Sequence, residues 1–243
     1  MSPIFVMLAA LLSLPYALSD DFSVVRERVL ETVVWPSPTS LPGVVSSANA
    51  SAHALNVTCL WADINYADQS RANWQAIIHL NRVQTLVLAA TTPGSTAFED
   101  AFLMERLHCA LDAWIFRFPV FTNPNWWYSW IGEEEILQTT FLALGLNRTT
   151  ASEQAALTRF SYNSSWWIND YGGGDNLSDM LNVELLRGLA TTNETAVAQA
   201  FDVLWQTCVI QHVTTPGAEG VMDDFVSHCS RASCALDHSI LRH

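Results

Sequence analysis

Apolar side chains recur at intervals of three and four residues through most of the 243-residue chain, a spacing typical of α-helices. No segment shows the alternation of apolar and polar residues that predicts a β-strand. We therefore predict an all-α protein made of helical hairpins. The predicted helices cover residues 22–35, 68–90, 96–116, 130–144, 150–160, 177–190 and 194–211.

Two pairs of residues mark the expected starts of helices. Thr96 with Glu99, and Thr150 with Glu153, have the spacing of a capping box, in which each side chain satisfies a free backbone N–H of the other residue. Residues 36–50 are rich in Pro, Ser, Gly and Ala, and are therefore predicted to form a loop or linker.

The N-terminus predicts a secretory signal. Residues 3–18 are almost entirely apolar but too short to span a bilayer comfortably. The small residues Ala17 and Ser19 place the expected cleavage near Ser19, so that residues 1–19 would be a signal peptide of a secreted, extracellular protein. The alternative is a buried first helix. No later segment is long and apolar enough to predict a membrane anchor.

Two further features agree with secretion. Six Asn-x-Ser/Thr sequences occur, against about two expected by chance, which predicts a glycosylated product. They begin at Asn49, Asn56, Asn147, Asn163, Asn176 and Asn193. Disulfides are allowed in a secreted chain, and an odd number of cysteines leaves one thiol over. The five cysteines are Cys59, Cys109, Cys208, Cys229 and Cys234.

Composition and charge exclude several classes of partner. The chain carries 24 acidic and 11 basic residues, a formal net charge of −13, which argues against binding nucleic acid or an anionic membrane surface. There is no Cys-x-x-Cys sequence and no His/Cys cluster at zinc spacing, so we expect neither a metal site nor a cofactor. Ten tryptophans are unusually many, and indole faces stack well on sugar rings.

Two tandem tryptophan pairs, Trp126–Trp127 and Trp166–Trp167, lie about forty residues apart in predicted loops. Forty residues correspond to one helical hairpin, so both loops could open at the same end of a helical array. The alternative is two pairs of core tryptophans. Residues 123–132 place the first pair beside Asn and Tyr, a composition that suits a sugar platform because amides bind hydroxyl groups. A loop merely anchored by its aromatics would have the same composition.

A glycine-rich segment, Gly172 to Gly174, precedes Asp175 and Asn176 at the start of a predicted helix. Glycines allow a close approach of backbone to a ligand. Asn176 either caps this helix or projects into a cleft.

These segments, in this order, resemble polysaccharide lyase family 8, which contains the hyaluronate, chondroitin AC and xanthan lyases. Asn125 to Gly132 fits the family's N-W-W-x-x-x-I-G pattern, and Gly174 to Ser178 resembles its G-A-N-[RL]-[TS] segment, with Asp in place of the usual small residue. Leu186 to Gly188 and Glu219 to Asp224 resemble two further segments of the family. The similarity covers roughly residues 60–225.

The resemblance implies an incomplete α/α toroid, in this family an N-terminal domain followed by β-sandwich domains. It implies β-elimination at a uronic acid of an acidic polysaccharide, without a cofactor. By the motif match, Asn176 would bind the C5 carboxylate and acidify the C5 proton, while Asn125, Trp126 and Trp127 would form the substrate platform. A His/Tyr pair of the family transfers the protons.

The C-terminal part departs from the family. His228 lies near the position of the family's His, in a register that differs by a residue or more, and no Tyr follows Tyr171. We therefore expect residues 20–224 to form a partial toroid that lacks the β-sandwich domains, and residues 225–243 to be a divergent tail of a truncated or frame-shifted product. Without the proton-transferring Tyr, the chain as written is expected to show little or no lyase activity.

The sequence leaves two main hypotheses for function. The first is a secreted polysaccharide lyase, of which this chain is a piece; the second is a catalytically inactive, secreted carbohydrate-binding protein. With a charge of −13, attraction of an acidic polysaccharide would depend on a few arginines, which leaves the polymer open. The candidates are Arg117, Arg148, Arg159 and Arg187.

A third interpretation concerns the helix predicted over residues 130–144 and expected to end at Gly145. Its first turn contains three acidic residues, which favour the positive end of the helix dipole. These are Glu133, Glu134 and Glu135. An α/α-toroid glycoside hydrolase would need a carboxylate pair at its cleft, which could combine them with Asp170 or Asp175.

Overall fold

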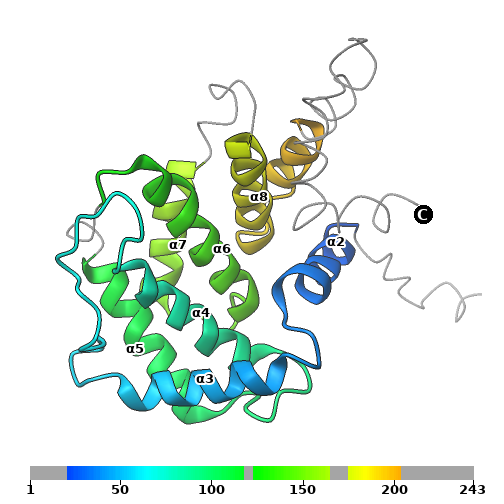
Figure 1. The fold of residues 1–243 in the computed structure, drawn as a ribbon. Helices are drawn as coiled ribbons and strands as arrows, with labels where there is room; N and C mark the ends of the chain where they lie inside the picture. The colour runs from blue at the N-terminus through cyan, green and yellow to red at the C-terminus, as the bar shows by residue number, and fades with distance from the viewer. Residues whose placement is uncertain (1–20, 118–122, 165–174, 204–243) are drawn as a thin grey trace, which may run out of the picture.

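A computed structural model describes residues 21–117, 123–164 and 175–203 of the chain, in which helices are joined by irregular connections (Figure 1). Within these residues the only β contact is an isolated bridge between Leu55 and Trp61. The helices are α2 (Asp21–Val29), α3 (Leu41–Ala54), α4 (Ile77–Thr91), α5 (Ala101–Arg117), α6 (Glu133–Leu144), α7 (Ala151–Ser164) and α8 (Asp175–Ala190). Two π-helical turns, η1 (Leu30–Val34) and η2 (Tyr128–Gly132), precede α3 and α6, and residues 194–203 form a further helix.

The helices pack as successive hairpins around α4 and α6. Helix α4 contacts α3, α5 and α6, and α6 in turn contacts α7 and α8 (Figure 1). Each helix turns one apolar face inward: the buried residues Leu80, Val83 and Val87 of α4 are spaced by three and four, as a helical stripe requires. The predicted all-α fold built from helical hairpins is therefore confirmed for the described residues. None of the helices described is long and apolar enough to cross a bilayer.

Helix boundaries confirm some sequence predictions. Thr150 and Glu153 form the predicted capping box at the start of α7: the Thr150 N–H donates to Glu153 Oε2 (2.6 Å), and the Glu153 N–H donates to Thr150 Oγ1 (3.3 Å). Gly145 ends α6 with φ of +74°, a left-handed conformation that glycine adopts without strain.

The prediction of a capping box at Thr96 and Glu99 is wrong. Glu99 has φ of +54° and its N–H donates to Ala90 O, so its backbone folds back onto the end of α4. Asp100 caps α5 instead, because its Oδ1 accepts a hydrogen bond from the Leu103 N–H at 2.9 Å. The N-cap of α5 is therefore Asp100, which directly follows Glu99 in the sequence.

Two predicted boundaries are also wrong. Residues 36–50 are not a loop, because α3 begins at Leu41: Pro42 suits the first turn of a helix, and Ala48 and Ala52, four residues apart, are buried against the core. The helix predicted from residue 68 begins only at Ile77. Residues 65–75 form an irregular segment, which we call the 65–75 loop.

A disulfide joins Cys59, which lies in the connection between α3 and α4, to Cys109 in α5. It closes a loop of 50 residues and fixes the segment before the 65–75 loop to the helical array. The remaining cysteines lie outside the described residues, as do the predicted signal peptide and the tail over residues 225–243.

Candidate functional site

Trp126 and Trp127 begin the helical segment that leads through η2 into α6, rather than lying in a loop as predicted. Both indoles are partly buried and pack against a small apolar cluster of Ile131, Met180 and Val183. Met180 and Val183 belong to α8, so the tryptophan pair bridges the ends of two helices that are distant in sequence.

Neighbouring residues fix the orientation of the two indoles. Trp126 contacts the ring of Trp130, with centroids 5.6 Å apart, and Trp127 meets Tyr128 edge-on at 5.4 Å. The six-membered ring of Trp127 also lies against the backbone of Gly132, where a Cβ atom would approach within 2.6 Å of Trp127 Cζ3. The pair therefore forms a preorganised aromatic surface, which we call the Trp platform.

Position 176 lies in the first turn of α8, four residues before Met180 and seven before Val183. Residues separated by four and seven share one face of a helix, so position 176 is on the face of α8 that packs against the Trp platform. The side chain of Asn176 lies outside the described residues, and its predicted catalytic role stays a prediction. Trp166, Trp167 and the other predicted site residue, His228, also lie outside the described part of the chain.

Asn125 lies directly before the Trp platform and uses both ends of its amide to hold the chain. Its Nδ2 donates to the carbonyl oxygen of Arg71 at 2.9 Å, while its Oδ1 accepts from the Trp127 N–H at 3.2 Å. Asn123 acts in the same way: its Nδ2 donates to Ser70 O and its Oδ1 accepts from the Asn125 N–H. The structure thus gives Asn125 an anchoring role, and its predicted contact with substrate stays a prediction.

The 65–75 loop packs beside the platform through Trp74 and Tyr128. The Trp74 N–H donates to Tyr128 Oη at 3.2 Å, and the two rings contact each other edge-on at 5.4 Å. Trp74 also contacts Trp114 of α5, which in turn contacts His79 of α4. Aromatic contacts therefore run from the platform into the protein core.

His79 is buried at the inner end of these contacts and is uncharged at neutral pH. Burial lowers the pKa of His79 to about 4. Its Nε2 lies 2.9 Å from Ala110 O, which can only accept, so Nε2 carries the proton and Nδ1 accepts from Tyr66 Oη–H at 3.0 Å. The ring thereby ties α5 to Tyr66 at the start of the 65–75 loop.

Glu133 and Glu134 are buried where α6 follows the Trp platform, each with 2 % of its surface exposed. Burial, with a smaller contribution from the charge of the neighbouring Glu134, raises the pKa of Glu133 to about 9, and burial raises the pKa of Glu134 to about 8. Both carboxyls are thus protonated at neutral pH. As sequestered neutral groups, they do not supply the accessible acid and base that the glycoside hydrolase interpretation needs.

Further polar contacts join α6 to α8 and stabilise the second helix. Glu135 Oε1 accepts a hydrogen bond from Asn182 Nδ2 at 3.0 Å, and Glu184 forms an ion pair with Arg187 within α8. Burial raises the pKa of Glu135. These contacts hold α8, and with it position 176, in register with α6.

The arginines predicted to attract an acidic polymer are mostly engaged within the protein. Arg148 pairs with Glu99, Arg187 pairs with Glu184, and Arg159 donates to the Ile115 carbonyl. Arg117 ends α5. Burial raises the pKa of Tyr66 and lowers the pKa of His79, and the charge of Arg117 adds a smaller lowering to both. Its charge therefore acts on the side of the protein where the 65–75 loop lies.

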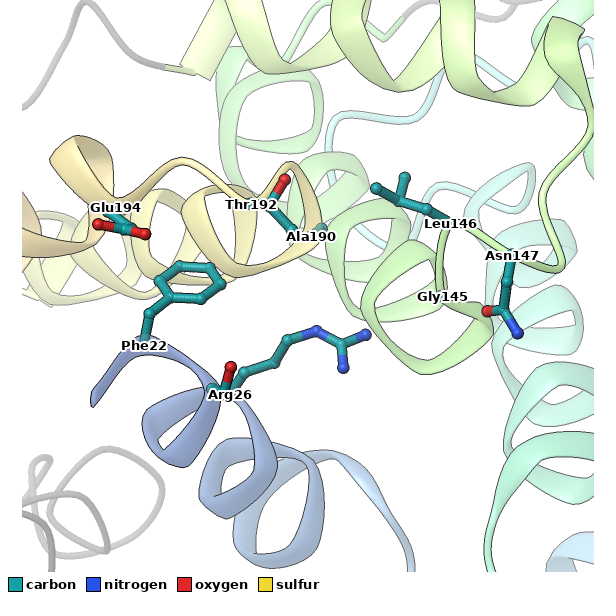
Figure 2. A pocket seen from close by; sticks show the side chains of 9 residues that line it. Phe22, Arg26, Gly145, Leu146, Asn147, Ala190, Thr192 and Glu194 are labelled. Carbon is teal, nitrogen blue, oxygen red and sulfur yellow. The ribbon is translucent and has the colours of Figure 1, made fainter. Parts of the chain in front are cut away.

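A separate pocket of about 400 Å³ lies at the opposite end of α6 (Figure 2). It is formed by α2 and by the residues that follow α6 and α8, and Arg26 donates across it to Leu142 O. Its lining comprises Phe22, Ser23, Arg26, Gly145, Leu146, Asn147, Ala190, Thr192 and Glu194. No sequence motif indicated this pocket.

No group of three or more potential metal ligands occurs among the residues that the structure describes.

The arrangement of helices matches solved polysaccharide lyases. A chondroitinase AC lyase, solved with oligosaccharides, is 18 % identical with a TM-score of 0.64 over 76 % of this chain and 27 % of its own. The chondroitin AC lyase of Streptomyces coelicolor A3 is 21 % identical, with a TM-score of 0.62 over 76 % of this chain and 27 % of its own. A Paenibacillus xanthan lyase is 17 % identical, with a TM-score of 0.60 over 76 % of this chain and 19 % of its own. The fold is therefore that of the helical domain of such lyases.

Comparison with protein-family models identifies the family of this chain. Residues 40–232 match the N-terminal α-helical domain of polysaccharide lyase family 8, and the chain belongs to this family. It spans about a quarter of the length of the chondroitin AC lyases and less of the xanthan lyase. No curated protein matches the chain in a direct sequence comparison.

Proposed function

We propose that this chain is the carbohydrate-binding helical part of a secreted polysaccharide lyase that cleaves a uronic-acid-containing polysaccharide by β-elimination. One observation carries the proposal: Trp126 and Trp127 pack against Met180 and Val183, on the face of α8 that also contains position 176. A sugar stacked on the platform would therefore lie within reach of the start of α8.

The chemistry assigned to this geometry is substrate positioning and charge neutralisation. The indoles stack on the C–H face of one sugar, and the Asn176 amide hydrogen-bonds the C5 carboxylate of the uronic acid. Neutralising that carboxylate lowers the pKa of the C5 proton, which a base then removes as the bond to the leaving oxygen breaks. The chain carries no cofactor in this scheme.

The second candidate function concerns the residues that transfer the protons in the family, a His and a Tyr. No Tyr follows Tyr171, and His228 stands outside the family's usual register. A catalytically inactive carbohydrate-binding protein would keep the Trp platform and need no such group. Chondroitin sulfate, which the Streptomyces coelicolor A3 lyase binds in one solved complex, is a suitable first ligand.

Binding and turnover separate these functions. The full chain is titrated with chondroitin sulfate oligosaccharides, using tryptophan emission, and product formation is followed by the ultraviolet absorbance of the unsaturated uronic acid. Trp127→Ala should abolish most binding, because stacking on an aromatic ring contributes strongly to the affinity. Asn176→Ala should weaken binding of the charged sugar, with Asn49→Ala, at an exposed position on α3, as the matched control.

The outcomes are distinct. Binding with turnover supports the lyase, binding without turnover supports the inactive binding protein, and failure of the wild-type chain to bind any acidic oligosaccharide contradicts both. Secretion is tested separately by expressing the full chain in a eukaryotic cell and treating the medium with an N-glycosidase. A secreted band that shifts supports the glycosylated product, whereas retention inside the cell contradicts it.

A further inference from the structure

The 65–75 loop is held against the Trp platform by three hydrogen bonds that connect residues more than fifty positions apart. Two are donated by the Asn123 and Asn125 amides to successive backbone carbonyls, those of Ser70 and Arg71, and the third is donated by the Trp74 N–H to Tyr128 Oη. The Asn125 amide that bonds Arg71 also accepts from Trp127. One side chain thus links the backbone of Arg71 to the platform.

The loop has its own internal supports, which make its position a fixed property of the fold. Asp68 Oδ2 accepts from the Gln75 N–H at 2.9 Å, and the Trp74 indole N–H donates to Asp68 O at 3.0 Å. Trp74 is buried among aromatic rings, with 1 % of its surface exposed. A side chain carried by this loop is therefore presented beside the platform by a defined backbone.

Arg71 is exposed at this position, and its guanidinium has no ion pair within the described part of the chain. By contrast, Arg82, Arg148 and Arg187 each pair with a carboxylate. The positive charge of Arg71 is therefore not neutralised by a carboxylate of the described residues, in a chain whose net charge is −13. Arg117, whose charge acts on Tyr66 and His79, adds positive potential on the same side.

We propose that Arg71 is a specificity-determining residue, whose guanidinium binds an anionic substituent, carboxylate or sulfate, of the sugar adjoining the one on the Trp platform. The planar guanidinium presents paired N–H donors that fit either group. This inference rests on the proposed carbohydrate-binding function and adds the preference for acidic polymers, because the indoles themselves stack on charged and neutral sugars alike.

The test uses the full chain and the variants Arg71→Gln and Arg148→Gln. Both substitutions remove one positive charge, but Arg148 follows the far end of α6 from the platform. The backbone carbonyl that Asn125 bonds is unchanged in Arg71→Gln. Each protein is titrated with chondroitin sulfate, with desulfated chondroitin, and with desulfated chondroitin whose carboxyls are reduced, and thermal unfolding verifies that each variant is folded.

Arg71→Gln is expected to weaken binding of the charged polymers about tenfold, the usual effect of losing a hydrogen bond between charged groups, and to leave the neutral polymer unchanged. Arg148→Gln should bind all three as the wild type does. A loss confined to chondroitin sulfate identifies sulfate as the bound group, and a loss for both charged polymers identifies the carboxylate.

Equal weakening for all three polymers, the same loss in Arg148→Gln, or unchanged affinity in Arg71→Gln overturns the inference. If the wild type binds and Trp127→Ala does not, while Arg71→Gln is unaffected, the proposed function stands and only the role of Arg71 fails. If the wild type binds none of the polymers, both fail together.

Discussion

The indole of Trp127 lies against Gly132 so closely that only a residue without a side chain fits at that position. A Cβ atom there would lie 2.6 Å from Trp127 Cζ3 and 3.2 Å from two neighbouring ring atoms. Since the ring also packs against the apolar cluster of Ile131, Met180 and Val183, it has little freedom to move aside. The orientation of the platform therefore depends on a glycine within a helix.

Gly132→Ala is accordingly expected to displace Trp127, to lower the free energy of unfolding by about 1–3 kcal/mol through overpacking, and to weaken oligosaccharide binding. Urea unfolding and tryptophan-monitored titration measure the two effects. Gly43→Ala in α3 is the matched control, because no atom lies within 4 Å of its added Cβ. It should stabilise the helix slightly. Wild-type binding and stability in Gly132→Ala would contradict this account.

The buried carboxyl of Glu133 should make the free energy of unfolding fall as the pH rises. This carboxyl has a pKa of about 9 when folded, against an ordinary value of 4.5, so the folded state holds a proton that the unfolded chain has already released above that ordinary value. The free energy of unfolding should therefore decrease from about pH 5 to about pH 8. Glu133→Gln should remove part of this decrease and stabilise the protein by roughly 2 kcal/mol at pH 8.

Unfolding in urea at these two pH values measures the effect. Glu105→Gln, an exposed position on α5, is the control and should follow the wild-type pH dependence. A pH dependence of Glu133→Gln identical to that of the wild type would show that the carboxyl is solvated in the folded protein.

His108 and Glu153 form an ion pair whose contribution to stability also falls as the pH rises. Their 2.7 Å contact joins α5 to α7, and the hydrogen bond that His108 Nδ1 donates to Glu153 Oε1 raises the pKa of His108 above its ordinary value of 6.5. The pair stabilises the fold fully below that ordinary value, and this contribution is lost as the pH rises through the raised pKa. His108→Gln should therefore destabilise the protein more at about pH 5 than at about pH 8.5.

Thermal unfolding across this range tests the ion pair, with His53→Gln in α3 as the control. An equal loss of stability at both ends of the range would assign the effect of His108→Gln to packing rather than to charge.

The disulfide between Cys59 and Cys109 should contribute to stability through the loop of 50 residues that it closes. Replacing both cysteines by Ala is expected to lower the free energy of unfolding by about 3 kcal/mol, mainly by freeing the unfolded chain. Urea unfolding of the oxidised wild type and of the double variant provides the measurement. If a reducing agent destabilises the wild type and not the double variant, the bond is the cause; no effect on either would contradict the prediction.

The sequence predicted helices best where a local signal was complete. Thr150 and Glu153 cap each other without help from distant residues, and Gly145 ends α6 by its own backbone freedom. The prediction of a loop over residues 36–50 is wrong because small residues are typical of loops and also of helices that pack closely. In the fold, Ala48 and Ala52 are small enough for α3 to pack closely on the core, which a composition does not reveal.

The site shows the same division between local and distant information. The motif identified Trp126 and Trp127, but the anchoring of Asn125 and the placement of Arg71 depend on a contact across 54 residues. The sequence places Glu133 and Glu134 in the first turn of a helix predicted over residues 130–144. The helical segment actually starts at residue 126, which carries both carboxyls more than a turn inward and buries them.

The Trp platform packs against the same helix, α8, that contains position 176, so helical geometry alone sets where position 176 lies relative to the platform. A single residue inserted at position 178 or 179 would rotate residue 176 by about 100° relative to Met180 and Val183, and so carry it off the tryptophan side of the helix. Point substitutions along the outer surface of α8 would leave that alignment intact. Homologous chains that keep the site should therefore vary freely in the identity of those outer residues but conserve their number.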